Sequence, residues 1–256
     1  MILAIDIGNT NIVVGCFDND NVLFVERVST DHTKTELEYA ISLKNVLEIY
    51  GIKPSKVEGG IISSVVPPLT NVLKSSAEKI IAGDVLVVGP GIKTGLNIMM
   101  DNPASVGSDL IVDAVAAIHE YPVPLVFIDM GTATTISVID EEKRYRGGMI
   151  LPGIRVSMDS LTSRTAQLPR ISMEPPKKLI GRNTVDCMKS GMIYGNASCI
   201  DGMIRRIKKE LGREDVTVIA TGGLSTVIIP YCEEPIIYDN ELLLKGLRLI
   251  YKKNHS

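Results

Sequence analysis

Apolar runs and polar turns alternate from the start of the chain. Residues 2–5 and 12–17 are rich in β-branched and other apolar side chains, and they flank a short polar turn. Residues 18–21, Asp-Asn-Asp-Asn, form a second polar stretch, and apolar positions then recur through residues 22–28. Runs of this kind bounded by turn residues predict three short strands joined by tight turns.

The hydrophobic spacing then changes to a helical period. Apolar positions in residues 35–50 recur every three or four residues and Gly51 follows, which predicts an amphipathic helix with a glycine stop. Beyond it we predict a strand over 60–66 ended by Pro67, a helix over 71–81, a strand over 85–88 and a helix over 108–120. This alternation is typical of an α/β sheet covered by helices.

The second half of the chain repeats the same order of elements. Residues 125–139 predict strand, turn and strand, and residues 144–150 predict a return strand after a polar turn. We predict a helix over 184–211, a strand over 216–220 and a final helix over 240–252. We therefore expect two α/β domains related by internal duplication, at residues 1–120 and 121–256, with the join uncertain by several residues.

The repeat is sharpest at two turns that follow buried strands. The first reads Asp6-Ile-Gly8-Asn9-Thr10-Asn11, and the second reads Asp129-Met-Gly131-Thr132-Ala-Thr134-Thr135. Gly8 allows the backbone to come close to a ligand, and the successive amides after it can point at phosphate oxygens. Asp6 would repel phosphate unless a cation intervened, so a hydrated Mg²⁺ is implied. A plain hairpin turn is the alternative for one copy, but two copies favour a nucleotide site.

Three further signals bear on the chemistry. Thr132 and Thr134 add hydroxyls that could bind phosphate oxygens, although β propensity alone would also explain them. Gly222 and Gly223 follow the strand over 216–220 and could lie beneath an adenine or ribose. Asp109 stands at a predicted helix start, where it is either an N-cap or a general base for a hydroxyl that attacks the γ-phosphate.

Composition excludes several classes of protein. Hydrophobic residues make up 45% of the 256 residues, charged residues 22%, and the formal net charge is −3. That balance fits a globular protein and gives no electrostatic footprint for nucleic acid. No apolar run approaches the roughly 18 residues that a membrane span needs. The four scattered cysteines and the lack of a signal peptide favour the cytoplasm. The chain has no P-loop and no nucleophile elbow.

These motifs together resemble the type III pantothenate kinases of the acetate and sugar kinase/Hsc70/actin superfamily. The resemblance rests on the two Asp-x-Gly turns and on three further segments, which are Asn102-Pro103 with Gly107-Ser108-Asp109, Gly147-Gly148 with Pro152-Gly153, and Thr221-Gly222-Gly223. It spans essentially the whole chain. It implies two ribonuclease H-like domains of the actin-like ATPase type, with a nucleotide cleft between them.

The resemblance also implies the activity and the roles of single residues. The activity is ATP-dependent phosphorylation of pantothenate, the first step of coenzyme A biosynthesis, by a cytoplasmic homodimer. The residues implied for ATP are Asp6, Ile7, Gly8, Asn9, Thr10, Asn11, Ile12, Val13, Thr132, Gly222 and Gly223. Those implied for pantothenate are Met100, Gly107, Ser108, Asp109, Leu110 and Thr184, with Asp109 as the general base. Asp129 is implied to hold K⁺ or NH₄⁺, and Asp6 to serve Mg²⁺ through phosphate and water.

Two positions depart from the family pattern. Leu110 stands where the family usually has Arg, and Met100 stands where it usually has Tyr. An exchange of Arg for Leu removes a charged, bidentate fork. These departures favour one alternative, a kinase of the same scaffold with a different small-alcohol acceptor. A nucleotide-binding regulatory protein without kinase activity is a second alternative, and a phosphatase on this fold is a weaker third.

Overall fold

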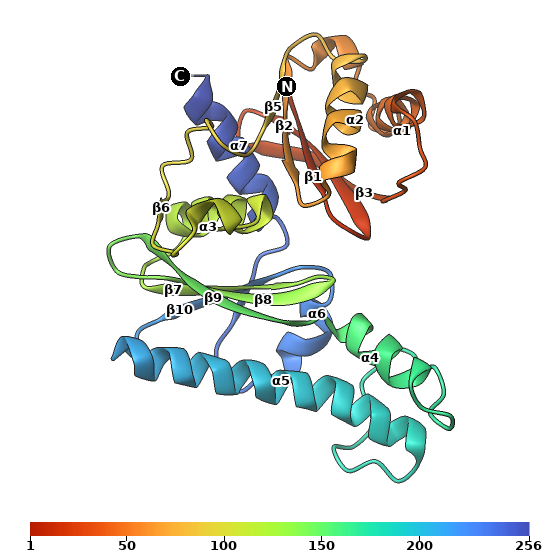
Figure 1. Ribbon diagram of the computed structural model, residues 1–256, viewed down its shortest axis with the longest axis vertical. Helices are drawn as coiled ribbons and strands as arrows, with labels where there is room; N and C mark the ends of the chain where they lie inside the picture. Colours follow the sequence, from red (N-terminus) through yellow and green to blue (C-terminus); the bar gives the residue numbers. More distant parts are fainter. Residues whose placement is uncertain (256) are drawn as a thin grey trace. The chain divides into compact units, whose positions relative to one another are not determined.

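The computed structural model describes residues 1–255, and the chain divides into two compact units. Unit 1 contains residues 1–96, residues 101–116 and the chain from residue 242 onward. Unit 2 contains residues 97–100 and 117–241. Each unit is built around its own sheet (Figure 1).

The sheet of unit 1 has five strands in the order β3-β2-β1-β4-β5. They are β1 Ile2–Ile7, β2 Asn11–Asp18, β3 Asn21–Ser29, β4 Gly59–Ser64 and β5 Val85–Val87. The helices are α1 Glu36–Ile49, α2 Pro67–Glu78, α3 Ser108–Glu120 (which begins in this unit) and α7 Leu242–Asn254, with short 3₁₀ turns at Pro54–Lys56 and Pro103–Ser105. β1 pairs antiparallel with β2 and parallel with β4, so the carboxyl ends of β1 and β4 lie at one sheet edge.

Both faces of this sheet are covered. One face packs against α1 and α2 through Leu43, Leu47 and Leu73, each at most 2% exposed. The other face packs against α7, where Leu247 and Ile250 are fully buried. The apolar positions that predicted α1 and the final helix are therefore the faces of these helices that pack on the sheet.

Unit 2 repeats this arrangement. Its strands are β6 Asn97–Ile98, β7 Leu125–Met130, β8 Ala133–Ile139, β9 Arg144–Pro152, β10 Thr217–Thr221 and β11 Ile237–Tyr238. Its helices are α4 Ile154–Ser163, α5 Thr184–Leu211 and α6 Ser225–Ile228, followed by a 3₁₀ turn at Ile229–Tyr231. The sheet order is β11-β10-β7-β8-β9-β6. Apart from the added β6, strands in equivalent sequence positions occupy equivalent places in the two sheets, which supports the predicted duplication.

The long helix α5 forms one wall of the core of unit 2. Its 28 residues run along one face of the sheet (Figure 1). Ile193, Ala197 and Ile204 of this helix are at most 1% exposed and pack against β7, β8 and β10. Asn183 caps the start of α5 by accepting a hydrogen bond from the Asp186 N–H at 2.9 Å, and Gly212 ends it in the left-handed conformation. The predicted helix over 184–211 is confirmed at both ends.

Three predictions on the elements need correction. The second helix begins at Pro67 rather than residue 71, because proline is well suited to the first turn of a helix, where its missing N–H costs nothing. Helix α4 was not predicted, since Ile154–Ser163 is largely polar. The final helix belongs to unit 1, whereas we predicted a second domain that extends over 121–256. The apolar face of an amphipathic helix is visible in the sequence, but the sheet against which that face packs is not.

The N-terminus of α1 gives a stability prediction. Thr35 and Glu38 form a capping box, in which the Thr35 hydroxyl accepts from the Glu38 N–H and the Glu38 carboxylate accepts from the Thr35 N–H. Thr35→Ala should lower the free energy of unfolding by about 1 kcal/mol, because an amide of the first turn loses its acceptor. Urea unfolding measures this, and His32→Ala, on an exposed residue before the cap, is the control. Equal stability of both variants would contradict the role of the cap.

Candidate active site

The first Asp-x-Gly turn joins β1 to β2 in unit 1. The Gly8 N–H donates to the Asn11 carbonyl at 3.1 Å, and a Cβ on Gly8 would lie only 2.9 Å from that oxygen. The Thr30 hydroxyl donates to the Gly8 carbonyl at 2.6 Å, and the Thr30 N–H donates to the Thr10 carbonyl at 3.1 Å. These hydrogen bonds fix the turn to Thr30, directly after β3, while Asn9 and Thr10 are exposed. The turn thus presents backbone amides to solvent on a fixed frame.

The predicted ATP residues around this turn divide into two kinds. Ile7 and Ile12 are at most 1% exposed and belong to the core, so only their backbone atoms can reach a ligand. Asp6 is 9% exposed and stands in register with Val13 on one side and Ser63 on the other. Its carboxylate therefore lies at the sheet edge where the turn begins.

The start of α3 is fastened to the same sheet edge. The Ser108 hydroxyl accepts from the Ser64 N–H and donates to the Ser64 carbonyl, both at 2.9 Å. Its oxygen also lies 3.0 Å from the Ser63 hydroxyl. Because Ser63 is the register partner of Asp6, the residue after Ser108 is held near the first turn. That residue is Asp109.

The environment of Asp109 suits a proton acceptor. Burial raises the pKa of this carboxyl, and the hydrogen bond from the Leu110 N–H at 2.8 Å opposes that rise only in part. Gly107 approaches so closely that a Cβ there would collide with Asp109 Oδ1. A carboxylate with a raised pKa binds a proton more readily than an ordinary aspartate does, which is the property that a general base needs.

The second Asp-x-Gly turn joins β7 to β8 in unit 2. The Gly131 N–H donates to the Ala133 carbonyl at 2.9 Å, and the Gly153 N–H donates to the Thr132 carbonyl at 3.1 Å. Gly153 lies so close beneath the turn that a Cβ there would come within 2.6 Å of the Gly131 carbonyl oxygen. The Thr132 side chain is exposed. The second turn is therefore built like the first: the N–H of its glycine closes the loop, and a residue from a later segment donates to one of its carbonyl groups.

The Thr221-Gly222-Gly223 turn lies against the Asp129 turn. β10 runs parallel to β7, with Thr221 in register with Asp129. Gly222 has a φ of +90°, and a Cβ there would lie 2.5 Å from Asp129 Oδ1 and 2.7 Å from the Met130 carbonyl oxygen. Sequence reasoning placed both segments near a nucleotide, and the structure brings them into contact within unit 2.

The residues beside Asp129 fit a cation. Thr135 is the cross-strand partner of Asp129, so the two side chains share one face of the sheet. Thr135 Oγ1 is buried, and it has no hydrogen-bond partner among residues 1–255. A carboxylate and an unsatisfied hydroxyl on one face are the oxygen donors that a hard cation takes. The described residues contain no group of three His, Cys, Asp or Glu side chains that could hold a metal ion. A Mg²⁺ near Asp6 would thus depend on phosphate and water oxygens.

The Thr134 hydroxyl could either bind phosphate or reflect β propensity alone, and the orientation of its side chain favours the second interpretation. Its side chain points to the opposite face of β8 from Asp129, because side chains alternate along a strand. Thr134 is 7% exposed and lines a small cavity beside α5. Its hydroxyl is therefore directed away from the face that carries Asp129 and Thr135.

The residues predicted for the acceptor lie in both units. Gly107, Ser108, Asp109 and Leu110 belong to unit 1, whereas Met100 and Thr184 belong to unit 2. Met100 packs its sulfur over Gly147, 2.8 Å from where a Cβ would be, and Gly147 has a φ of +112°. Thr184 is exposed at the first turn of α5. Both the positive φ and the contact with the Met100 sulfur therefore favour glycine at position 147.

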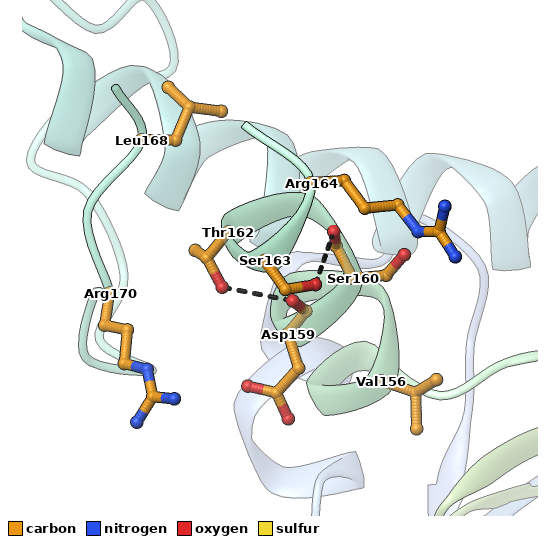
Figure 2. Close-up of a pocket in the computed structure, with 8 residues that line it drawn as sticks. All are labelled: Val156, Asp159, Ser160, Thr162, Ser163, Arg164, Leu168 and Arg170. Carbon is orange, nitrogen blue, oxygen red and sulfur yellow. Dashed lines mark hydrogen bonds between the residues drawn. The ribbon is translucent and has the colours of Figure 1, made fainter. Parts of the chain in front are cut away.

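A larger hollow lies away from all of these residues. It has a volume of about 750 Å³ and lies between α4 and the segment that follows it, with Asp159 and Arg170 on opposite sides (Figure 2). None of the predicted site residues lines it.

The sequence carried no sign of the supporting roles of Ser63 and Thr30, and Gly153 and Thr135 stood out only as members of motifs, without a role of their own. Ser63 and Thr30 act through contacts between residues 22 to 45 positions apart, which no local pattern reveals. Helix α4, which Gly153 precedes, did leave a signal. Ile154, Met158 and Leu161 stand at helical spacing directly after a glycine.

Solved structures with this fold define the class. The chain resembles (R)-2-hydroxyglutaryl-CoA dehydratase component A from Acidaminococcus fermentans, with a TM-score of 0.56 and 15% identity over 100% of this chain and 99% of the other. It also resembles the activator of 2-hydroxyisocaproyl-CoA dehydratase from Clostridium difficile, with a TM-score of 0.54 and 12% identity over 98% and 93%. At these identities the likeness shows the fold alone. With its two sheets, the chain has the two-domain actin-like ATPase fold.

Sequence comparisons give the family. A model of the type III pantothenate kinases matches residues 2–206. The chain is 48% identical to a type III pantothenate kinase from an Exiguobacterium species and 47% identical to one from Brevibacillus brevis, each over 100% of both chains. The chain belongs to the type III pantothenate kinase family. Among its described residues, no helix combines the length and the apolar character that a membrane crossing requires.

Proposed function

We propose that this protein transfers the γ-phosphoryl group of ATP to the primary hydroxyl of pantothenate, the first step of coenzyme A biosynthesis. One observation carries the proposal. A chain that matches the family over its full length keeps both glycine-closed Asp turns and a half-buried Asp109, which follows the Ser108 that is fastened to the unit 1 sheet. A cytoplasmic homodimer and a nucleotide cleft between the two domains stay predictions.

In this proposal the chain supplies positioning and electrostatics. Asp109 accepts the proton of the attacking hydroxyl, which strengthens the nucleophile as it meets the phosphorus. The exposed amides of the Gly8 turn, and those beside Thr132, donate to phosphate oxygens on which charge accumulates in the transition state. Mg²⁺, held near Asp6 through phosphate and water, neutralises part of that charge when it is bound. The Ser108 hydroxyl is hydrogen-bonded to the backbone of Ser64 in β4, and Ser108 thereby positions the start of α3.

The test of the activity is an ADP-release assay with pantothenate as acceptor. We expect turnover that depends on pantothenate and is higher in K⁺ than in Na⁺ at equal ionic strength. Mass spectrometry of the product should show one added phosphoryl group. ATP hydrolysis that is unaffected by pantothenate in either salt would overturn the substrate assignment.

The monovalent cation gives a separate prediction at Thr135. Thr135→Val keeps the shape of the side chain but removes the orphaned hydroxyl beside Asp129. The K⁺ concentration for half-maximal rate should rise about tenfold, the equivalent of about 1.4 kcal/mol. Thr226→Val, on an exposed threonine of α6, is the matched control. An unchanged K⁺ dependence would place the cation elsewhere.

Leu110 supports a second candidate, a kinase of the same scaffold with another small-alcohol acceptor. The backbone of Leu110 binds Asp109, and its side chain offers no charge for the carboxylate of pantothenate. In the same assay, a neutral alcohol used with a higher kcat/KM than pantothenate would favour this candidate.

A further inference from the structure

A small cavity in unit 2 lies behind the second glycine turn, on the α5 side of the sheet. It has a volume of about 160 Å³. Met130 and Thr134, which flank the turn, form its floor together with Ile136, and α4 and α5 contribute the walls through Ile154 and Asn196. All of these residues belong to unit 2. Apart from Thr134, whose hydroxyl was a candidate for phosphate contact, no residue predicted to contact ATP, cation or acceptor lines this cavity.

Two polar side chains line the cavity. Thr134 is 7% exposed, and its hydroxyl can both donate and accept a hydrogen bond. Asn196 donates from Nδ2 to the Met192 carbonyl at 2.6 Å, which leaves its Oδ1 without a protein donor in the described chain. A ligand that hydrogen-bonds to these two side chains is stabilised by those bonds.

The rest of the lining is mostly apolar, with the Ser157 hydroxyl and the Cys199 thiol as its other polar groups, and no charged side chain belongs to it. An apolar cavity of about 150 Å³ is large enough to bind benzene. We propose that this cavity is a binding site for a small uncharged ligand with an apolar body about the size of a benzene ring and one hydroxyl or amide group. The apolar body contacts Met130, Ile136 and Ile154, and the polar group meets Thr134 and Asn196. The site does not depend on the proposed function, because its walls are separate from the acceptor residues.

Cys199 of α5 lines the cavity and is exposed to solvent, so its thiol stands at the mouth. This thiol can be labelled by disulfide exchange, which allows a test of the proposal. The thiolate attacks one sulfur of a small disulfide, a mixed disulfide forms, and the other half leaves as a thiol, so no outside oxidant is needed. Cys187 is also exposed and lies on the same helix, but it does not line the cavity. It is therefore a matched internal control.

The experiment equilibrates the full-length protein with 2-mercaptoethanol and the disulfide of 2-(4-hydroxyphenyl)ethanethiol, and peptide mass spectrometry quantifies the adducts at each cysteine. We expect the ratio of hydroxyphenyl adduct to mercaptoethanol adduct to be about tenfold higher at Cys199 than at Cys187, the equivalent of about 1.4 kcal/mol. Thr134→Val should remove the advantage of the hydroxyphenyl probe over a plain phenyl probe while both phenyl rings stay enriched at Cys199.

Two outcomes would overturn the proposal. The first is the same adduct ratio at both cysteines, because the ring would then gain nothing from the cavity. The second is a Cys199 that no thiol labels while Cys187 reacts, because the mouth of the cavity would then be closed in the intact protein. A melting curve of Thr134→Val checks that the variant is folded.

Discussion

Asp109→Asn should lower kcat by about 10²- to 10⁴-fold, the range that a general base contributes, while the affinity for ATP stays unchanged. The amide can still accept the hydrogen bond from the Leu110 N–H at 2.8 Å, so the start of α3 keeps its geometry. What is lost is the group that accepts the proton of the acceptor hydroxyl. Steady-state kinetics with ATP and acceptor varied separately would measure both effects.

The control for this variant is Asp101→Asn, which removes an exposed carboxylate from the segment before α3. It should retain wild-type kcat. An Asp109→Asn variant that turns over as fast as the wild type would exclude Asp109 as the base and leave only its role at the start of the helix.

The raised pKa of Asp109 fixes the sign of two pH effects. Burial disfavours the ionised carboxylate in the folded protein, so activity should fall as pH drops through a pKa above that of an ordinary aspartate. The same burial makes the ionised form a cost to stability at neutral pH, and that cost disappears as pH falls through the folded-state pKa. Asp109→Asn should therefore melt at the same or a higher temperature at pH 7 while losing activity. A residue that is kept for function rather than stability is expected to show this combination of lost activity and retained or increased stability on substitution.

Gly222→Ala should be the most damaging change at the second turn. Its φ of +90° strains any side chain, and the added Cβ would lie 2.5 Å from Asp129 Oδ1 and 2.7 Å from two backbone atoms of Met130. We expect a loss of about 1–3 kcal/mol in the free energy of unfolding from the backbone strain. We also expect the KM for ATP to rise about tenfold, because Asp129 and the turn after it must shift.

Gly223→Ala is the matched control for this change. Gly223 is the next residue, its φ lies outside the left-handed region, and nothing lies within 4 Å of where its Cβ would be. It should change the KM for ATP and the melting temperature little. If both variants lost activity equally, the damage would come from the glycine pair as a flexible hinge and not from the contact with Asp129.

The sequence predicted those parts of the molecule that repeat or follow a regular period. The two Asp-x-Gly turns stood out because an apolar strand precedes each one, and α3 and α5 end at the predicted residues. The fastening of Ser108 to Ser63 could not be foreseen. It joins residues 45 positions apart, and Ser63 lies in a short strand of glycine, isoleucine and serine that carries no local sign of such a contact.

The faces of β8 show the same limit. Both Thr134 and Thr135 follow the second glycine turn, and from sequence alone the Thr134 hydroxyl could either bind phosphate or only support the strand. The register of β7 with β8 decides the matter, because it pairs Asp129 with Thr135 and Met130 with Thr134. A one-residue step reverses the face that a side chain occupies, so a motif can be right in position and wrong in orientation.

The place of α7 has a consequence for synthesis on the ribosome. Leu244, Leu247 and Ile250 of this helix fill the second face of the unit 1 sheet, whose strands all lie within the first 87 residues. Val112 of α3 belongs to the same cluster, but the part of that face which α7 covers stays open while most of unit 2 is translated, until α7 emerges. Nascent chains of this protein thus expose an apolar sheet for most of their synthesis, a period in which a chaperone that shields apolar surface would matter most.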